Sequence, residues 1–265
     1  MRLIAIMNQK GGVGKTTTAV NVSAALAATG QRVCLIDLDP QAHASLHLGI
    51  DPRPESASVY DVLVRNARLA DVRRQVAENL WVVGSHLDLA AAELELAGVV
   101  GREILLRDKL DEDPEEFDYV LIDCPPSLGI LTLNALAAVE EVLIPLQPHF
   151  LALHGLSKLL ETIELVAKRL NGRLRLGGVI LCMYDSSTRL AVEVSQDVDD
   201  FFRRAQAAQS PWSDARIFQT RIRRNVRLAE APSFGQSIFQ YAPASNGAED
   251  YRHLADELLE ATPEA

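Results

Sequence analysis

Gln9-Lys10-Gly11-Gly12-Val13-Gly14-Lys15-Thr16-Thr17 is the stretch that decides the fold of this 265-residue chain. An apolar run, residues 3–7, precedes it and predicts a β-strand. An alanine-rich segment of helical period, residues 16–28, follows it and ends near Gly30, a common helix terminator. A glycine-rich loop between a strand and a helix is a typical phosphate-binding setting. The stretch therefore predicts an α/β fold with an anion site where the first helix begins.

The residue types of this loop suit a nucleoside triphosphate and its metal ion. Glycines let successive N–H groups point inward and approach phosphate oxygens closely. Lys15 would place its charge near the β- and γ-phosphates, and the Thr16 hydroxyl would ligate Mg²⁺. A glycine-rich turn without a ligand is the alternative, but glycines, lysine and threonines all fall in register after a strand. We expect ATP and Mg²⁺ here, bound by Gly11, Gly12, Val13, Gly14, Lys15, Thr16 and Thr17.

Two aspartates end the second predicted strand. Residues 35–41 place Asp37 and Asp39 at its carboxyl end, the edge where open α/β sheets bind ligands. Asp39 is the candidate to orient an attacking water, and Asp37 to support the Mg²⁺ shell or the loop lysines. Asp39 before Pro40 also suits a helix N-cap, a role that is compatible with catalysis.

A further aspartate, Asp123, follows the apolar residues 119–122 and precedes Cys124 and two prolines. This is a Walker B pattern, in which the carboxylate holds Mg²⁺ through a water or a hydrogen bond to Thr16. A strand that simply exits to solvent is the alternative. A buried strand that ends in aspartate and two prolines favours the metal site.

Further Val, Ile and Leu runs, separated by helical segments, predict the rest of the fold. The predicted strands are residues 32–38, 80–83, 119–124, 142–146 and 178–183, and the predicted helices are 156–170, 190–205 and 249–260. The pattern is typical of a doubly wound α/β fold of the P-loop NTPase type, with a mostly parallel sheet and helices on both faces. Because there is no clear linker or repeat, we expect a single domain over residues 1–265, without a separate N-terminal DNA-binding domain.

Composition narrows the classes of function. The formal net charge is −10, which argues against a protein that is basic overall but not against a local basic patch. No apolar run reaches the roughly 18 to 20 residues of a membrane span, so we expect a cytoplasmic protein. Cys34, Cys124 and Cys182 stand far apart, which makes a disulfide framework or a zinc site improbable.

Four ordered blocks of sequence give the chain a resemblance to a known family. They are N-Q-K-G-G-V-G-K-T-T-T at residues 8–18, L-I-D-L-D-P-Q at 35–41, V-L-I-D-C-P-P-S-L-G at 120–129, and R-N-V-R-L-A-E-A-P-S-F-G at 224–235 followed by G-A-E-D-Y at 247–251. Together they resemble ParA-type (Soj-like) partition ATPases of the MinD/ParA deviant Walker A superfamily. The resemblance implies a Mg²⁺-dependent ATP hydrolase that forms a homodimer with ATP. It also implies a ParB-like partner and a role in chromosome or plasmid partition on the nucleoid.

Roles for Lys10 and Asn225 come from this resemblance. In the family the early loop lysine, here Lys10, reaches across the dimer to the partner's ATP, and the asparagine at position 225 lies near the adenine base. The chain departs from the family at Arg223, where proline is usual, and at Cys182, where threonine is more common. These departures concern purine selectivity rather than phosphate binding. A plain turn residue is the alternative for Asn225.

Five arginines lie between residues 216 and 227. A solvated loop whose arginines pair with an acidic surface is the alternative. Arginine suits phosphate geometry, and the segment resembles the family region that touches DNA. We therefore expect non-specific binding of double-stranded DNA by the ATP-bound dimer, through Arg221, Arg223, Arg224 and Arg227.

Rival classes fit the sequence less well. A MinD-like membrane-bound regulator would need a basic amphipathic C-terminal helix, whereas residues 253–260 are acidic, so no membrane partner is expected. An iron–sulfur reductase would need paired cysteines, so burial is the better interpretation of Cys124. A nucleotide-dependent scaffold without hydrolysis is the serious alternative, and Asp39 argues against it.

Overall fold

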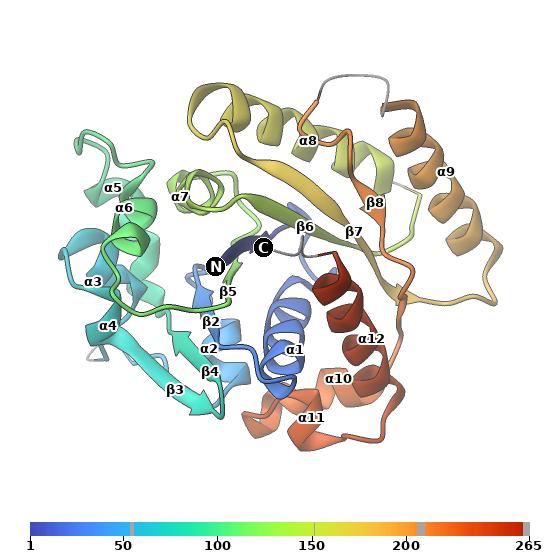
Figure 1. Cartoon of the computed structure of the whole chain (residues 1–265), viewed down its shortest axis with the longest axis horizontal. Helices are drawn as coiled ribbons and strands as arrows, with labels where there is room; N and C mark the ends of the chain where they lie inside the picture. Colours follow the sequence, from blue (N-terminus) through green and yellow to red (C-terminus); the bar gives the residue numbers. More distant parts are fainter. Residues whose placement is uncertain (54–55, 151, 206–209, 262–265) are drawn as a thin grey trace.

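A largely parallel β-sheet forms the centre of the molecule (Figure 1). This computed structural model describes residues 1–53, 56–150, 152–205 and 210–261. Within these residues the strand order is β3-β4-β2-β5-β1-β6-β7-β8, with β9 paired to β7. The pairs are parallel except β3 with β4. The strands are β1 (Arg2–Ile6), β2 (Val33–Asp37), β3 (Arg73–Ala77), β4 (Leu80–Val83), β5 (Tyr119–Asp123), β6 (Glu141–Leu146), β7 (Arg175–Tyr184), β8 (Arg216–Ile217) and β9 (Ile222–Arg223).

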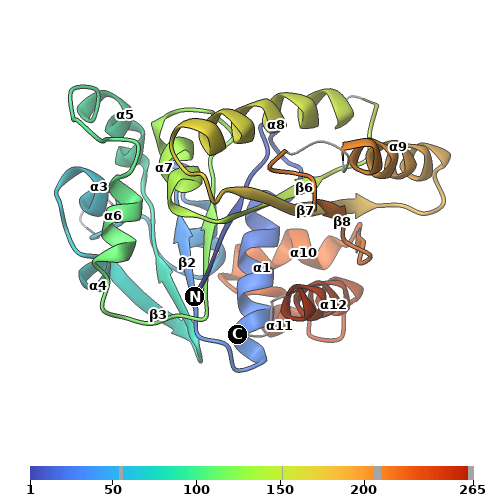
Figure 2. The ribbon, with the colours of Figure 1, turned by 45° about the horizontal axis from the view of Figure 1, so that its top comes forward.

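Helices cover both faces of the sheet. Figure 2 shows α8 and α9 on one side of β6 and β7, and α1 and α10 to α12 on the other. The longer helices are α1 (Lys15–Ala28), α7 (Ile130–Ala138), α8 (Ala152–Arg169), α9 (Arg189–Ala205) and α12 (Asn246–Glu260). The shorter ones are α2 (His43–His47), α3 (Val59–Val64), α4 (Leu69–Val72), η1 (Leu87–Ala91), α5 (Ala92–Glu95), α6 (Leu105–Asp111), α10 (Val226–Glu230), η2 (Ala231–Phe234) and α11 (Ile238–Tyr241).

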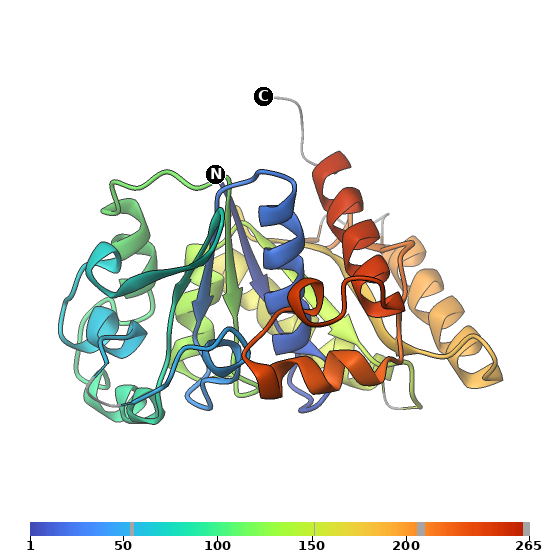
Figure 3. The ribbon, with the colours of Figure 1, turned by 90° about the horizontal axis from the view of Figure 1, so that it is seen from below.

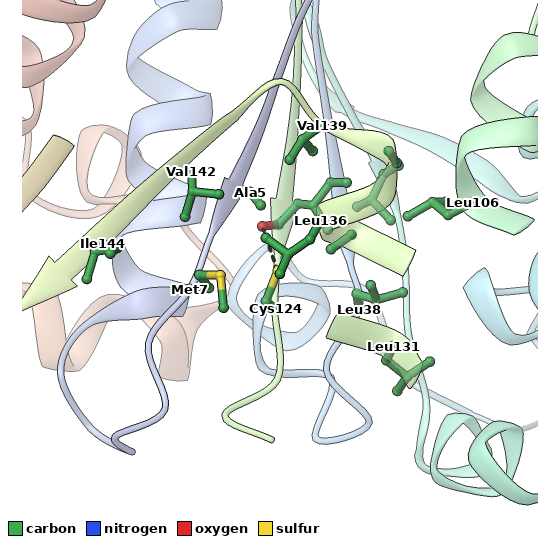
Figure 4. Close-up of a cluster of buried hydrophobic side chains, with 14 of the residues drawn as sticks. Ala5, Met7, Leu38, Leu106, Cys124, Leu131, Leu136, Val139, Val142 and Ile144 are labelled. Carbon is green, nitrogen blue, oxygen red and sulfur yellow. Dashed lines mark hydrogen bonds between the residues drawn. The ribbon is translucent and has the colours of Figure 1, made fainter. Parts of the chain in front are cut away.

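The sheet separates two buried apolar clusters, because successive strand side chains point to opposite faces. In β1, Ala5 joins the cluster under α7 and α8, whereas Ile4 and Ile6 join the cluster under α1 and α12. Figure 4 shows part of the first cluster, where Leu136 of α7 lies near Cys124, and Val139, which directly follows this helix, belongs to the same cluster. Cys124 is completely buried, as predicted. Apolar runs in the central strands thus follow from burial on both faces.

The predicted doubly wound α/β fold is confirmed, and every predicted strand and helix is present, with the predicted ends for β4 and shifted ends for the others. The edge strand β3 was not predicted, because its sequence Arg-Arg-Gln-Val-Ala is polar and its pairing is antiparallel. The two-residue strands β8 and β9 are too short for a periodic signal. In the described part of the chain, no helix is long and apolar enough to cross a membrane.

Strand register sets up the site. Ile6 of β1 and Asp37 of β2 both pair with Asp123 of β5. The loop after β1 and two acidic strand ends therefore meet at one edge of the sheet, seen from the side in Figure 3.

Candidate functional site

The loop between β1 and α1 presents an open helix N-terminus. Gly14 precedes α1 with a φ of 96°, a left-handed conformation that glycine adopts without strain. Among the described residues, no side chain caps this helix. Asn8 anchors the loop, since its Nδ2 donates to the carbonyl of Pro145 on β6 at 2.8 Å. Because uncapped N–H groups and the helix dipole attract anions, the loop is built to hold a phosphate.

Lys15 lies inside the loop rather than in solvent. Its side chain is largely buried, and Nζ donates to the carbonyl of Lys10 at 3.2 Å. Burial lowers the pKa of Lys15, an effect that the charges of Asp123 and Asp39 oppose. A desolvated ammonium that bonds only a backbone carbonyl can exchange that carbonyl for a phosphate oxygen at little cost.

Asp123 is a buried carboxyl that lacks ordinary hydrogen bonds. It is 0% exposed, and neither oxygen accepts a hydrogen bond of normal geometry from the described residues. Burial and then the charge of Asp37 raise its pKa well above the usual range, although Thr16 and Lys15 work in the opposite direction. A buried carboxylate without donors is costly unless a cation or a proton satisfies it. The position beside Thr16 therefore fits a divalent cation.

Asp37 has the same burial but a different set of contacts. Its Oδ2 accepts hydrogen bonds from the Ser45 hydroxyl at 2.7 Å and the Ser45 N–H at 2.8 Å, and its Oδ1 accepts one from the Asp39 N–H at 3.2 Å. Burial raises its pKa to about 6, and the bonds from Ser45 reduce that shift. Asp37 is thus already satisfied by protein groups and ties α2 to the sheet.

Asp39 lines the cavity beside Thr16. Its Oδ1 accepts a hydrogen bond from the Gln41 N–H at 2.9 Å, which closes a local turn. The interpretation of Asp39 as a helix N-cap is wrong: the next helix, α2, begins at His43, and its N-cap residue is Ala42. The turn leaves Asp39 at the mouth of the phosphate loop.

Lys10 lies exposed at the tip of the loop. Its Nζ is 2.7 Å from Nε2 of His149, which follows β6. Its N–H donates to Asn8 Oδ1 at 3.0 Å, and its carbonyl accepts the hydrogen bond from Lys15. The side chain thus reaches across to a segment 139 residues away in sequence.

A cavity of about 700 Å³ extends from the loop to the C-terminal elements. Its far wall includes Cys182 and Met183 at the end of β7, Asn225, and Tyr251 of α12. Tyr251 hydroxyl and Thr18 Oγ1 are 3.1 Å apart, which joins α12 to α1. The volume and the mixed lining suit a nucleotide with its phosphates in the loop.

Known proteins match this chain over nearly its whole length. A family model described as an AAA domain matches residues 1–176. Sporulation initiation inhibitor protein Soj of Bacillus subtilis is 46% identical over 97% of this chain and 98% of its own length. Chromosome partitioning protein ParA of Myxococcus xanthus is 44% identical over 97% and 88%, respectively. The chain belongs to the Soj/ParA family.

A solved structure with a bound nucleotide analogue agrees with the interpretation of this cavity as a nucleotide site. Cobyrinic acid a,c-diamide synthase from Mycobacterium smegmatis, with bound ATP analogue and magnesium, has a TM-score of 0.82 and 37% identity to this Soj/ParA chain. The match covers 98% of this chain and 95% of that one.

On the base side of the cavity, two predicted residues have structural partners. Asn225 lines the cavity, and its side-chain oxygen accepts a hydrogen bond from the Arg227 N–H at 2.8 Å, which caps α10. Its contact with a purine stays a prediction. Arg223, the departure from the family pattern, pairs with Asp250 and Glu249 of α12, each at 2.6 Å.

The four arginines predicted to bind DNA do not share one environment. Arg221 is half-buried, and its guanidinium donates to the carbonyls of Phe218 and Gln219. Arg223 is held by α12, as described. Arg227 pairs with Glu230 at 2.8 Å on the exposed surface, whereas Arg224 is exposed at the rim of the cavity. Binding of a DNA phosphate backbone by these arginines stays a prediction.

Two neighbours of the site escaped sequence analysis. Ser45 satisfies Asp37, and His149 holds Lys10. Neither belongs to a local motif, since each contact joins segments that only the fold brings together. The signal for both lies in the sheet order, which places the loops after β1, β2 and β6 at one edge.

Proposed function

We propose that this chain binds ATP with Mg²⁺, hydrolyses it, and uses the cycle to partition DNA. The observation that carries the proposal is the buried carboxyl of Asp123, which accepts no hydrogen bond of normal geometry from the described residues and lies beside Lys15 and Thr16, at the open N-terminus of α1. These groups suit a Mg²⁺-bound triphosphate. The carboxyl of Asp123 and the ammonium of Lys15 are costly to bury unless ions of opposite charge satisfy them.

The residues divide the work as follows. Lys15 leaves the Lys10 carbonyl for the β- and γ-phosphates, and the loop N–H groups hold the other phosphate oxygens. Thr16 and Asp123 would hold the metal, directly or through water, and Asp37 would support them by fixing α2. Mg²⁺, when bound, neutralises charge that develops on the phosphate oxygens. Asp39 orients the attacking water from the cavity wall.

Lys10 supplies the link between ATP and assembly. It lies exposed on the loop, where its ammonium can reach a second copy's phosphates. The ATP-bound chain is thus a homodimer that encloses its nucleotides. Asn225 contributes to the base side of the same cavity.

DNA partition requires further partners. The dimer binds double-stranded DNA non-specifically, which places it on the nucleoid of the cytoplasm, and a ParB-like protein stimulates its weak hydrolysis. The support is the family, whose curated members are named chromosome-partitioning proteins. Cobyrinic acid diamide synthesis is the second candidate, because a structure with that name is 37% identical. Partition is favoured by the higher identities of 46% and 44% to Soj and ParA.

Nucleotide binding and phosphate release test the proposal. Lys15→Ala should lose binding of a fluorescent ATP analogue, because the site's affinity is largely electrostatic. Asp39→Ala should bind ATP, release little phosphate and accumulate as a dimer, whereas Lys10→Ala should lose both release and dimer. Circular dichroism checks that each variant folds.

Three results discriminate the alternatives. ATP binding by folded Lys15→Ala equal to the parent's contradicts the phosphate-loop assignment. A dimer that forms with ATP while phosphate release stays at background supports the scaffold without hydrolysis. ATP-dependent amidation of cobyrinic acid by the parent supports the synthase.

A further inference from the structure

The contact between Lys10 and His149 has no part in binding a nucleotide within one subunit. It joins an exposed lysine to a half-buried histidine at 2.7 Å. A lysine ammonium has three donors and no acceptor, so Nε2 of His149 must accept and the imidazole proton must lie on Nδ1. His149 is itself fixed by the turn that starts α8, because its carbonyl accepts a hydrogen bond from the Ala152 N–H at 2.9 Å.

All three polar parts of Lys10 are restrained in the free subunit. The N–H bonds Asn8, the carbonyl bonds Lys15, and the ammonium bonds His149. When Lys15 turns to a phosphate, the carbonyl is released. The contact with His149 then remains as the restraint that keeps the ammonium on its own subunit.

We propose that His149 is a positioning residue for Lys10, which holds the lysine on its own subunit until the ATP-bound dimer forms. This inference rests on the proposed function, in which Lys10 acts across the dimer. Each subunit must give up one Lys10–His149 hydrogen bond when the partner's phosphates receive the ammonium. The restraint therefore opposes dimerisation, and its removal favours the dimer.

The test measures the protein concentration at half-dimerisation, by sedimentation velocity, with Mg²⁺ and the slowly hydrolysed analogue AMPPNP. His149→Leu removes the acceptor in both subunits and should lower that concentration about ten- to hundredfold, which is about three- to tenfold for each of the two exposed charge-assisted hydrogen bonds that a dimer gives up. His149→Gln keeps an acceptor oxygen and should behave as the parent. His154→Leu is the matched control, because it removes an exposed histidine of α8 and leaves the Lys10–His149 bond in place.

A second measurement reports on the contact itself. Burial and then the charge of Lys10 lower the pKa of His149. Lys10→Met should therefore raise the pKa of His149, followed by NMR of the imidazole nitrogens in the full chain without nucleotide. A purely structural role for His149 would not make its titration depend on Lys10.

The outcomes separate this inference from the proposed function. If Lys10→Ala dimerises like the parent, the proposed role of Lys10 across the dimer is wrong. The proposed restraint of Lys10 by His149 is then wrong as well. If Lys10→Ala stays monomeric but His149→Leu dimerises like the parent, only the restraint is wrong. An unchanged pKa of His149 in Lys10→Met also overturns the restraint.

Discussion

Two aspartates at the same edge of the sheet show how single contacts divide roles. Asp37 and Asp123 are paired in register and equally buried, but only Asp37 accepts hydrogen bonds from Ser45. Asp37 is therefore held by protein groups, whereas Asp123 accepts no hydrogen bond of normal geometry from the described residues, which is the arrangement that the proposed Mg²⁺ site needs. The sequence alone does not distinguish them, because both follow apolar strands.

Asp123→Asn should separate stability from ligand binding. Without ligand, the variant replaces a carboxyl whose charged form is destabilised by burial, so the free energy of unfolding should stay equal or rise by about 1 to 3 kcal/mol. With ATP, the Mg²⁺-dependent gain in melting temperature should be lost. Thermal unfolding with and without Mg²⁺-ATP measures both effects.

Asp37→Asn is the matched comparison. An amide in place of this carboxyl offers one acceptor oxygen where Ser45 and Asp39 now use two. We expect a loss of about 1 to 3 kcal/mol in the free energy of unfolding. Equal stability changes in the two variants would contradict the division of roles between these aspartates.

The predictable part of the site is the part that lies in local motifs. The loop at residues 9–17 and Asp123 follow from spacing after a strand, since the chemistry needs those residues in sequence order. Asp39 was placed correctly at the edge, but its turn was misread as a helix cap. Ser45 and His149 could not be predicted, because their partners are distant in sequence.

At the scale of elements, α12 forms a wall of the cavity and is fixed by ion pairs. Asp250 accepts from both the N–H and the guanidinium of Arg223, at 2.8 and 2.9 Å, and its side chain is 6% exposed. Glu249 pairs with the same arginine but is 53% exposed. The two carboxylates therefore differ in desolvation more than in distance.

Asp250→Ala should loosen α12, because it leaves the Arg223 N–H and guanidinium without their main acceptor. We expect a loss of about 1 to 3 kcal/mol in stability and weaker ATP binding, since Tyr251 follows in the same helix. Glu249→Ala should cost much less, because its ion pair with Arg223 is exposed to solvent. Urea unfolding and nucleotide titration measure the difference, and similar losses in both variants would refute this account.

The short helix α2 carries a histidine that makes stability depend on pH. His47 is 1% exposed, and burial lowers its pKa from 6.5 to about 4, although a hydrogen bond with the Gln236 backbone works the other way. Below pH 6.5 His47 is protonated in the unfolded chain, whereas in the folded chain it stays neutral until the pH falls to about 4. Stability is therefore lost as the pH falls through this window, by up to about 3 kcal/mol.

Urea unfolding of the parent and His47→Gln across this window checks the effect. The free energy of unfolding should fall more steeply with acid in the parent, because glutamine does not titrate. Parallel pH profiles for the two proteins would show that His47 takes up its proton equally in both states.

Elements that bury both faces were the ones that sequence could predict. The strands β2, β5 and β6 are continuous apolar runs, because burial on both faces dictates their residues. The helices α8, α9 and α12 have amphipathic periodicity, whereas α7 was not predicted. The strand β3 lies at the edge of the sheet, and the helices α2 to α6 are short, so tertiary contacts rather than sequence pattern fix their backbone.

At the scale of the whole molecule, the net charge of −10 limits the affinity that this protein can have for DNA. Arg224 and Arg227 lie exposed near the cavity rim, and one such small patch on an acidic protein should bind weakly. An ATP-bound dimer presents two patches at once, which raises affinity through effective concentration. DNA binding should therefore require ATP, ignore sequence, and weaken with salt by a slope of about −0.9 per phosphate neutralised.

Fluorescence anisotropy with random duplexes, with ADP and with ATP across a salt series, tests this expectation. Arg224→Glu with Arg227→Glu should abolish binding, while ATP-dependent dimerisation stays intact. Arg189→Glu with Arg203→Glu makes the same change in net charge on α9 and is the matched control. This control should bind DNA nearly as the parent does, because the position of the arginines affects binding more than the net charge of the protein. Equal losses in both double variants, or parent binding that is the same with ADP, would show that this surface is not the DNA site.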